Sequence, residues 1–101
     1  MSERPTAGAR FLLELQSQSD DGARATYRGV IYTPDAEYET TATLDESGDV
    51  EMPHSDADAT LHGTLVMLAR LVARGATKRR EDGMPVWPQR MLRWRGPGRG
   101  E

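Results

Sequence analysis

The chain has 101 residues, of which 37% are hydrophobic and 29% are charged, and its formal net charge is −3. This length suits one compact domain, and the absence of cysteine excludes disulfides, thiol catalysis and thiolate metal sites. No apolar run approaches the length that crosses a bilayer, and the N-terminus lacks the apolar segment of a signal peptide. We therefore expect a soluble, cytoplasmic protein that has no contact with a membrane.

Charge is sorted by position along the chain. Residues 1–58 contain thirteen acidic and four basic residues, a net charge of −9, whereas residues 59–101 contain three acidic and nine basic residues, a net charge of +6. Such asymmetry often indicates an interaction surface. Within a folded monomer the two halves can also neutralise each other, and the asymmetry then identifies no partner.

Alternating apolar and polar residues in the first half predict antiparallel strands. Residues 1–8 are polar and are expected to form a flexible lead. Strands are predicted over residues 10–18, 24–33 and 37–44, with a short fourth strand around Val50 and Met52. Residues that favour turns separate the strands: Ser19-Asp20-Asp21-Gly22, Thr33-Pro34-Asp35-Ala36 and Glu46-Ser47-Gly48. The pattern predicts a β-meander.

The strand register follows from the rule that facing residues lie on the same side of a sheet. Placing Ile31 opposite Tyr38 aligns a series of core positions, namely Gly29 with Thr40, Tyr27 with Ala42 and Ala25 with Leu44. On the outer side, the same register sets Arg24 opposite Asp45 and Arg28 diagonal to Glu39. For the first hairpin we predict Leu13 opposite Tyr27 and Phe11 opposite Gly29.

One long helix is predicted after Pro53. Ser55 is the predicted N-cap, and the aspartates that follow it favour the positive end of the helix dipole. An apolar stripe with spacings of four, three and four contains Leu61, Leu65, Leu68 and Val72, and Ala69 and Leu71 widen it. Gly75 is the predicted stop. Gly63 is estimated to lie on the outer side of the helix.

In the C-terminal third of the chain, the sequence predicts a charged linker over residues 76–85 and then a strand or an extended strap from Met91 to Arg95. Residues 96–101 are rich in glycine and are expected to be disordered. The predicted fold class is therefore α+β, with a single domain over residues 9–95. A three- or four-stranded antiparallel meander packs on one long helix, and the C-terminal segment is an edge strand or a strap.

The candidate binding residues are basic or aromatic and lie in the C-terminal half: Arg79, Arg80, Trp87, Arg90, Arg93, Trp94 and Arg95. Arginine and tryptophan together can grip phosphate and stack on bases. The preferred interpretation is structural: the tryptophans complete a hydrophobic core, and the basic run at residues 78–80 is a solvated helix terminus that the helix dipole favours. The acidic predicted sheet argues against nucleic acid.

Catalytic and metal-binding patterns find little support. His54, Asp58 and His62 are spaced by four, which could align metal ligands on a helix, but Pro53 and the predicted cap place His54 outside the helix. The serines occupy turn or cap positions, and the chain has no glycine-rich phosphate loop and no nucleophile elbow. We expect no catalytic residues, no metal and no cofactor.

The leading functional hypothesis is a non-catalytic protein-interaction or accessory module. Its partner is another protein or a second copy, because a basic end can meet an acidic sheet and an edge strand invites pairing. The alternative is a nucleic-acid-binding protein that uses the arginine- and tryptophan-rich C-terminal segment.

Overall fold

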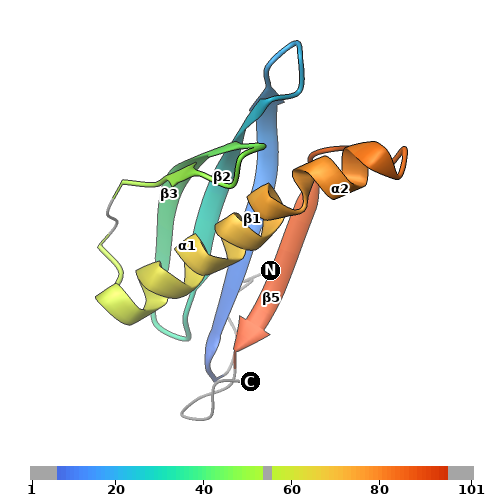
Figure 1. The fold of residues 1–101 in the computed structure, drawn as a ribbon. Coiled ribbons are helices and arrows are strands. Elements are labelled where there is room, and N and C mark those ends of the chain that lie inside the picture. Colours follow the sequence, from blue (N-terminus) through green and yellow to red (C-terminus); the bar gives the residue numbers. More distant parts are fainter. Residues whose placement is uncertain (1–6, 54–55, 96–101) are drawn as a thin grey trace.

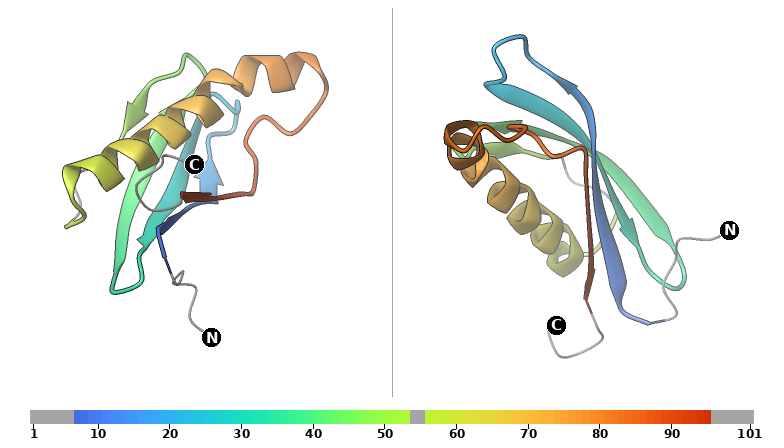
Figure 2. Two further views of the ribbon diagram at one scale, coloured as in Figure 1. Left: turned by 90° about the horizontal axis from the view of Figure 1, so that it is seen from below. Right: turned by 90° about the vertical axis from the view of Figure 1, so that its right-hand side faces the viewer.

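The computed structural model describes residues 7–53 and 56–95, and it has two layers, a twisted sheet and a bent helix on one of its faces (Figures 1 and 2). The α+β fold predicted from the sequence is confirmed. The predicted disordered tail lies outside the described residues, and so does the predicted flexible lead apart from Ala7 and Gly8.

The sheet is antiparallel with the strand order β4-β3-β2-β1-β5. Its strands are β1 (Ala9–Gln18), β2 (Arg24–Tyr32), β3 (Glu37–Asp45), β4 (Val50–Glu51) and β5 (Arg90–Arg95). The first four form the predicted meander. β5 returns from the far end of the chain and pairs with β1, so the C-terminal segment is an edge strand rather than a strap.

The register predicted for β2 and β3 is confirmed, because Ile31 lies opposite Tyr38 and every facing pair that follows agrees. The predicted proximity of Arg28 to Glu39 is also confirmed, since the two side chains form an ion pair on the outer face. Apolar and polar residues alternate along both strands, and the turn at Pro34 fixes where the hairpin closes. Only one register then places the apolar residues of both strands on the same side of the sheet.

The register predicted for β1 and β2 is wrong by two residues, because Phe11 lies opposite Ile31 and Leu13 opposite Gly29. The hairpin loop closes later than predicted, through a hydrogen bond from Ser19 N to Arg24 O (2.9 Å). That closure alone would put the core face of β1 against the outer face of β2. A β-bulge between Leu15 and Ser17 shifts the pairing by one residue and brings the two apolar faces into agreement.

Helix α1 (Ala59–Arg74) starts later than predicted. Its N-cap is Asp58, whose Oδ1 accepts a hydrogen bond from Leu61 N at 2.9 Å, so the prediction of Ser55 as the cap is wrong. Ser55 itself lies outside the described residues. A start at Ala59 lets the carboxylate of Asp58 satisfy an amide that has no partner within the helix.

The predicted linker after Gly75 is also wrong, because residues 76–81 form helix α2 (Ala76–Glu81). Gly75 has right-handed helical dihedrals, with φ −81° and ψ −5°. Backbone bonds continue through it, from Gly75 N to Leu71 O and from Arg79 N to Gly75 O. The helix therefore bends at this glycine instead of ending there (Figure 1).

The main core lies between the sheet and the helices. It contains Phe11, Leu13, Tyr27, Ile31, Leu44, Leu65, Leu68, Ala69, Val72, Ala76 and Trp87, with smaller neighbours. A second cluster on the opposite face of the sheet consists of Leu12, Val30 and Tyr32, with Leu92 packed against it. None of the described helices is long and apolar enough to cross a membrane.

Helix α1 crosses the sheet obliquely and packs on β2, β3 and β4 (Figure 1). β5 lies at the opposite edge of the sheet from β4. The helix and the edge strand β5 therefore flank the part of the core face that the helix leaves open.

Candidate functional site

The sequence candidates divide into residues that hold the fold together and residues that lie on β5. Trp87 belongs to the first group. It is buried, its Nε1 donates to Gly22 O at 2.7 Å, and its ring meets Tyr27 edge-on with centroids 6.5 Å apart. Tyr27 in turn donates its hydroxyl to Pro88 O at 2.7 Å, and burial raises the pKa of Tyr27 to about 12. Trp87 is thus a core residue.

Arg79 is tied to the backbone on two sides. Its Nε donates to Val86 O at 2.6 Å and its Nη2 to Val72 O at 2.5 Å. Burial lowers the pKa of Arg79. A Cβ at Gly75 would overlap the guanidinium, so the glycine gives this side chain its path. Arg79 fastens the loop after α2 to the end of α1 and presents little free charge.

Arg80 links the basic half of the chain to the acidic half. Its Nη2 lies 2.7 Å from Glu46 Oε2 and 3.4 Å from Gly22 O. Both side chains of this ion pair are partly exposed to solvent. The pair neutralises part of the sorted charge within one molecule.

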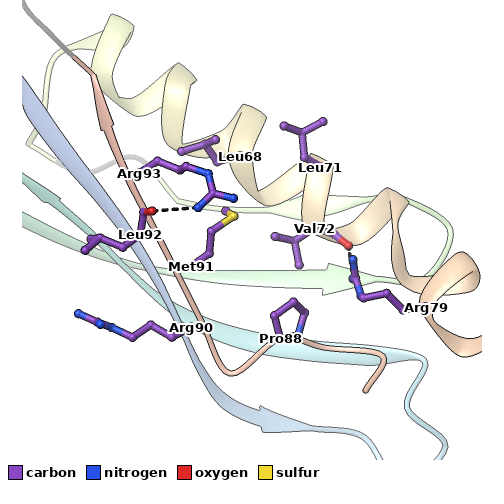
Figure 3. A pocket seen from close by; sticks show the side chains of 9 residues that line it. All are labelled: Leu68, Leu71, Val72, Arg79, Pro88, Arg90, Met91, Leu92 and Arg93. Atoms are coloured by element: carbon purple, nitrogen blue, oxygen red, sulfur yellow. Dashed lines mark hydrogen bonds between the residues drawn. The ribbon is translucent and has the colours of Figure 1, made fainter. Parts of the chain in front are cut away.

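The remaining candidates lie on β5, where side chains alternate between the two faces of the sheet. Met91 and Arg93 point toward α1, whereas Arg90 and Leu92 point to the other side (Figure 3). By the same alternation Arg95 shares the helix side and Trp94 the outer side. Trp94 is 49% exposed, and its Nε1 donates to Ala7 O at 3.0 Å.

An open groove of about 390 Å³ separates β5 from α1. Its lining contains apolar side chains but exposes almost as much polar as apolar surface, and the side chain of Arg93 lies over it from the β5 side (Figure 3). The lining residues are Leu68, Leu71, Val72, Pro88, Met91 and Leu92, together with Arg79, Arg90 and Arg93. Leu71, which the sequence assigned to the buried stripe, is 55% exposed, so that prediction is wrong.

Sequence reasoning missed this groove. The groove lies between an apolar flank of α1 and strand β5, which comes some twenty residues later in the chain. Only the angle at which the helix crosses the sheet brings the two together. The sequence feature that could have indicated the groove is Leu71, which lies at the edge of the apolar stripe of α1 rather than at its centre.

Within residues 7–53 and 56–95, no further strand pairs with the outer edge of β5. Leu15 N donates to Gln89 O at 2.8 Å. Because every second residue of an antiparallel strand bonds to the same neighbour, the backbone groups of Met91 and Arg93 also face β1. Antiparallel alternation then directs the backbone groups of Arg90, Leu92 and Trp94 away from β1. The Leu92 carbonyl accepts a bond from the guanidinium of Arg93, with Nη1 at 3.0 Å (Figure 3).

Of the three suggested metal ligands, the structure describes Asp58 and His62. Asp58 caps α1 and His62 is buried on it, while His54 lies outside the described residues. Within residues 7–53 and 56–95, no group of three or more histidine, aspartate or glutamate side chains is arranged to hold a metal ion.

A second hollow, of about 230 Å³, lies at the acidic β4 edge and is lined by Asp45, Asp49 and Glu51 among others. The carboxylate of Asp45 is occupied by its own turn, since it accepts bonds from the hydroxyl and amide of Ser47 and from the amide of Asp49. The bond from the Ser47 hydroxyl is the main reason that the pKa of Asp45 is lowered. This carboxylate serves the turn and is a poor base.

β5 and the adjoining groove therefore form the candidate site. Compared with models of known protein families, with curated proteins and with solved structures, the chain has no match.

Proposed function

We propose that the chain is a non-catalytic, cytoplasmic protein-interaction module that binds a protein partner along β5 and the adjoining groove. One observation carries the proposal: β5, which is the last strand of the sheet among the described residues, lies beside an open groove of mixed polarity on the core side of the sheet. Proteins recognise extended segments in this way, with backbone bonds supplying affinity and alternate side chains entering pockets.

The exposure of Leu71 supports the proposal. Leu71 is 55% exposed on the flank of α1, and covering it with a partner would be favourable because it removes apolar surface from water. Leu68 and Met91 continue the same apolar surface toward the sheet. Arg93 adds a charged group to this surface, and protein interfaces combine apolar and polar contacts in this way.

The experiment compares proteins captured from the source cell by two matched variants. Leu71→Lys places a charge in the groove, whereas Met84→Lys makes the same change at a residue that is 56% exposed and outside the groove. We expect the wild type and Met84→Lys to capture the same partner and Leu71→Lys to lose it. Identical capture by all three chains would contradict the proposal.

Self-association is one version of this proposal, in which the partner is a second copy. Light scattering over a range of concentrations tests it, since a dimer that Leu71→Lys dissociates and Met84→Lys preserves would identify the copy as the partner. A monomer throughout the range excludes this version.

A nucleic-acid partner is the second candidate, and the exposed Trp94 between Arg93 and Arg95 favours it. Arg79 and Arg80, by contrast, are engaged within the molecule. Anisotropy titrations with labelled single strands test this candidate. Binding through these side chains must weaken steeply with salt, and the absence of binding at low salt would exclude it.

A further inference from the structure

We propose that the partner contributes an extended acidic segment, which adds to the free edge of β5 as a sixth strand. This inference rests on the proposed function and names the chemistry of the partner. Three features of β5 carry it: the charge of its side chains, the contact between Arg93 and Leu92, and the position of its apolar residues.

The charge argument is the first. β5 has the sequence Arg-Met-Leu-Arg-Trp-Arg and contains no acidic residue. An added strand with carboxylates opposite Arg90 and Arg93 would pair both of these charges across the strands, and a carboxylate opposite Arg95 would match the sign of that position. A second copy pairing β5 with β5 would instead bring the arginines of both copies to one seam. Charge therefore selects an acidic segment over the pairing of β5 with β5 of a second copy.

The Arg93 side chain is the second argument. Leu92 presents its carbonyl at the free edge, where an added strand needs an acceptor, and the guanidinium of Arg93 covers that carbonyl. Charged side chains that shield edge strands limit indiscriminate pairing. A carboxylate opposite Arg93 offers the guanidinium a stronger acceptor than a carbonyl does. An acidic strand therefore draws the guanidinium of Arg93 away from the Leu92 carbonyl, which can then accept a backbone hydrogen bond. A neutral or basic strand leaves the guanidinium on the carbonyl.

The apolar residues define the rest of the pattern. Met91 faces the groove together with Leu71, and Leu92 faces the smaller apolar cluster on the other side of the sheet. Residues opposite these two positions are therefore apolar. For a strand antiparallel to β5, the matching segment reads acidic, apolar, acidic, apolar, apolar, acidic, beginning opposite Arg95 and ending opposite Arg90.

The test uses synthetic peptides of this pattern. The acidic peptide contains Glu-Val-Glu-Val-Ile-Glu, and the charge-swapped peptide replaces each glutamate with lysine. Binding is followed by fluorescence anisotropy near physiological ionic strength, about 0.15 M. We expect the intact chain to bind the acidic peptide with a Kd below ~1 mM and at least about tenfold more tightly than the lysine peptide.

Two double variants make the test specific to β5. Arg90→Glu with Arg93→Glu reverses charge at the site, and we expect it to bind the lysine peptide in preference to the acidic one. Arg70→Glu with Arg74→Glu makes the same change in net charge on exposed residues of α1 outside the groove, and it must retain the preference of the wild type. Circular dichroism confirms that each variant is folded.

Three results would overturn the inference. They are the absence of saturable binding of the acidic peptide, equal affinity for both peptides, and equal loss of binding in the two double variants. Each leaves the proposed function standing if Leu71→Lys still loses the partner that Met84→Lys retains. If both chains capture the same partner, the proposed function itself fails.

Discussion

The indole Nε1 of Trp87 donates a hydrogen bond to the carbonyl oxygen of Gly22 at 2.7 Å, across 65 residues of chain. The bond joins the segment before β5 to the loop between β1 and β2. Arg80, within α2, reaches Gly22 and Glu46 beside it. Arg80 therefore anchors α2 on the meander, and Trp87 anchors the segment between α2 and β5. This anchor holds β5 in place as an edge strand.

Replacing Trp87 by phenylalanine tests this anchor. The substitution keeps an aromatic ring but removes the donor, so the Gly22 carbonyl loses its short hydrogen bond and keeps only the longer one from Arg80, at 3.4 Å. We expect the free energy of unfolding to fall by about 1–3 kcal/mol. Trp94→Phe is the control, because Trp94 is half exposed and water can replace its bond; a change within about 0.5 kcal/mol is expected. Urea denaturation measures both, and equal losses would contradict the anchor.

Two glycine-to-alanine substitutions are expected to have opposite effects. Gly63 is helical and exposed, and an added Cβ meets nothing within 4 Å, so alanine should stabilise the protein by about 1 kcal/mol. At Gly29 the added Cβ would lie 3.1 Å from Cδ2 of the fully buried Leu65, and we expect a loss of about 1 kcal/mol. Thermal unfolding of both variants measures the signs; a destabilised Gly63→Ala would place that side of α1 against a neighbour.

The two adjacent arginines of α2 should contribute unequally to stability. Arg79→Met removes both bonds to the Val72 and Val86 carbonyls, and we expect a loss of about 1–3 kcal/mol. Arg80→Met removes an exposed ion pair with Glu46, which contributes about 0–1 kcal/mol. Chemical denaturation compares the pair. A larger loss at Arg80 would contradict the assignment of Arg79 as the structural residue.

Alkaline pH should destabilise the protein through Tyr27. Burial raises the pKa of Tyr27 to about 12 in the folded chain, from 10.0 for an ordinary tyrosine. Between these values the unfolded chain has released the proton while the folded chain still holds it. The contribution of Tyr27 is therefore complete below pH 10 and is lost as the pH rises toward 12. Unfolding measured from pH 9 to 12 should show a shallower decline for Tyr27→Phe than for the wild type, and parallel declines would contradict this shift.

Local pattern was sufficient to predict most of the sheet. The register of β2 and β3 follows from alternation around the Pro34 turn, since a slip of one residue would expose the core face of both strands. The register of β1 depended on a bulge after Leu15, which no residue in the segment announces. Alternation still assigned the side chains from Phe11 to Leu15 to the correct faces, because the error before the bulge was an even number of residues.

The helical region shows where single-residue signals mislead. Glycine commonly ends helices in a left-handed conformation, yet Gly75 is right-handed and the helix continues through it. The apolar spacing already extends past it, from Ala69 through Val72 to Ala76, and all three are buried. Periodicity across the glycine was therefore the better guide.

The candidate site was only half predictable. The sequence identified the arginines and tryptophans but could not separate Trp87, which is buried, from Trp94, which is exposed. That difference depends on which segments meet in the folded chain. The groove likewise depends on where α1 crosses the sheet, and this is a property of packing rather than of any one segment.

Amide hydrogen exchange at β5, measured by NMR with and without the acidic peptide, tests the central claim most directly. In the free chain, the amides of Met91 and Arg93 should be protected by β1, and those of Arg90, Leu92 and Trp94 should exchange rapidly. Saturation with the peptide should slow exchange at these three amides by about tenfold or more. Unchanged exchange at all three under saturating peptide would contradict strand addition at β5.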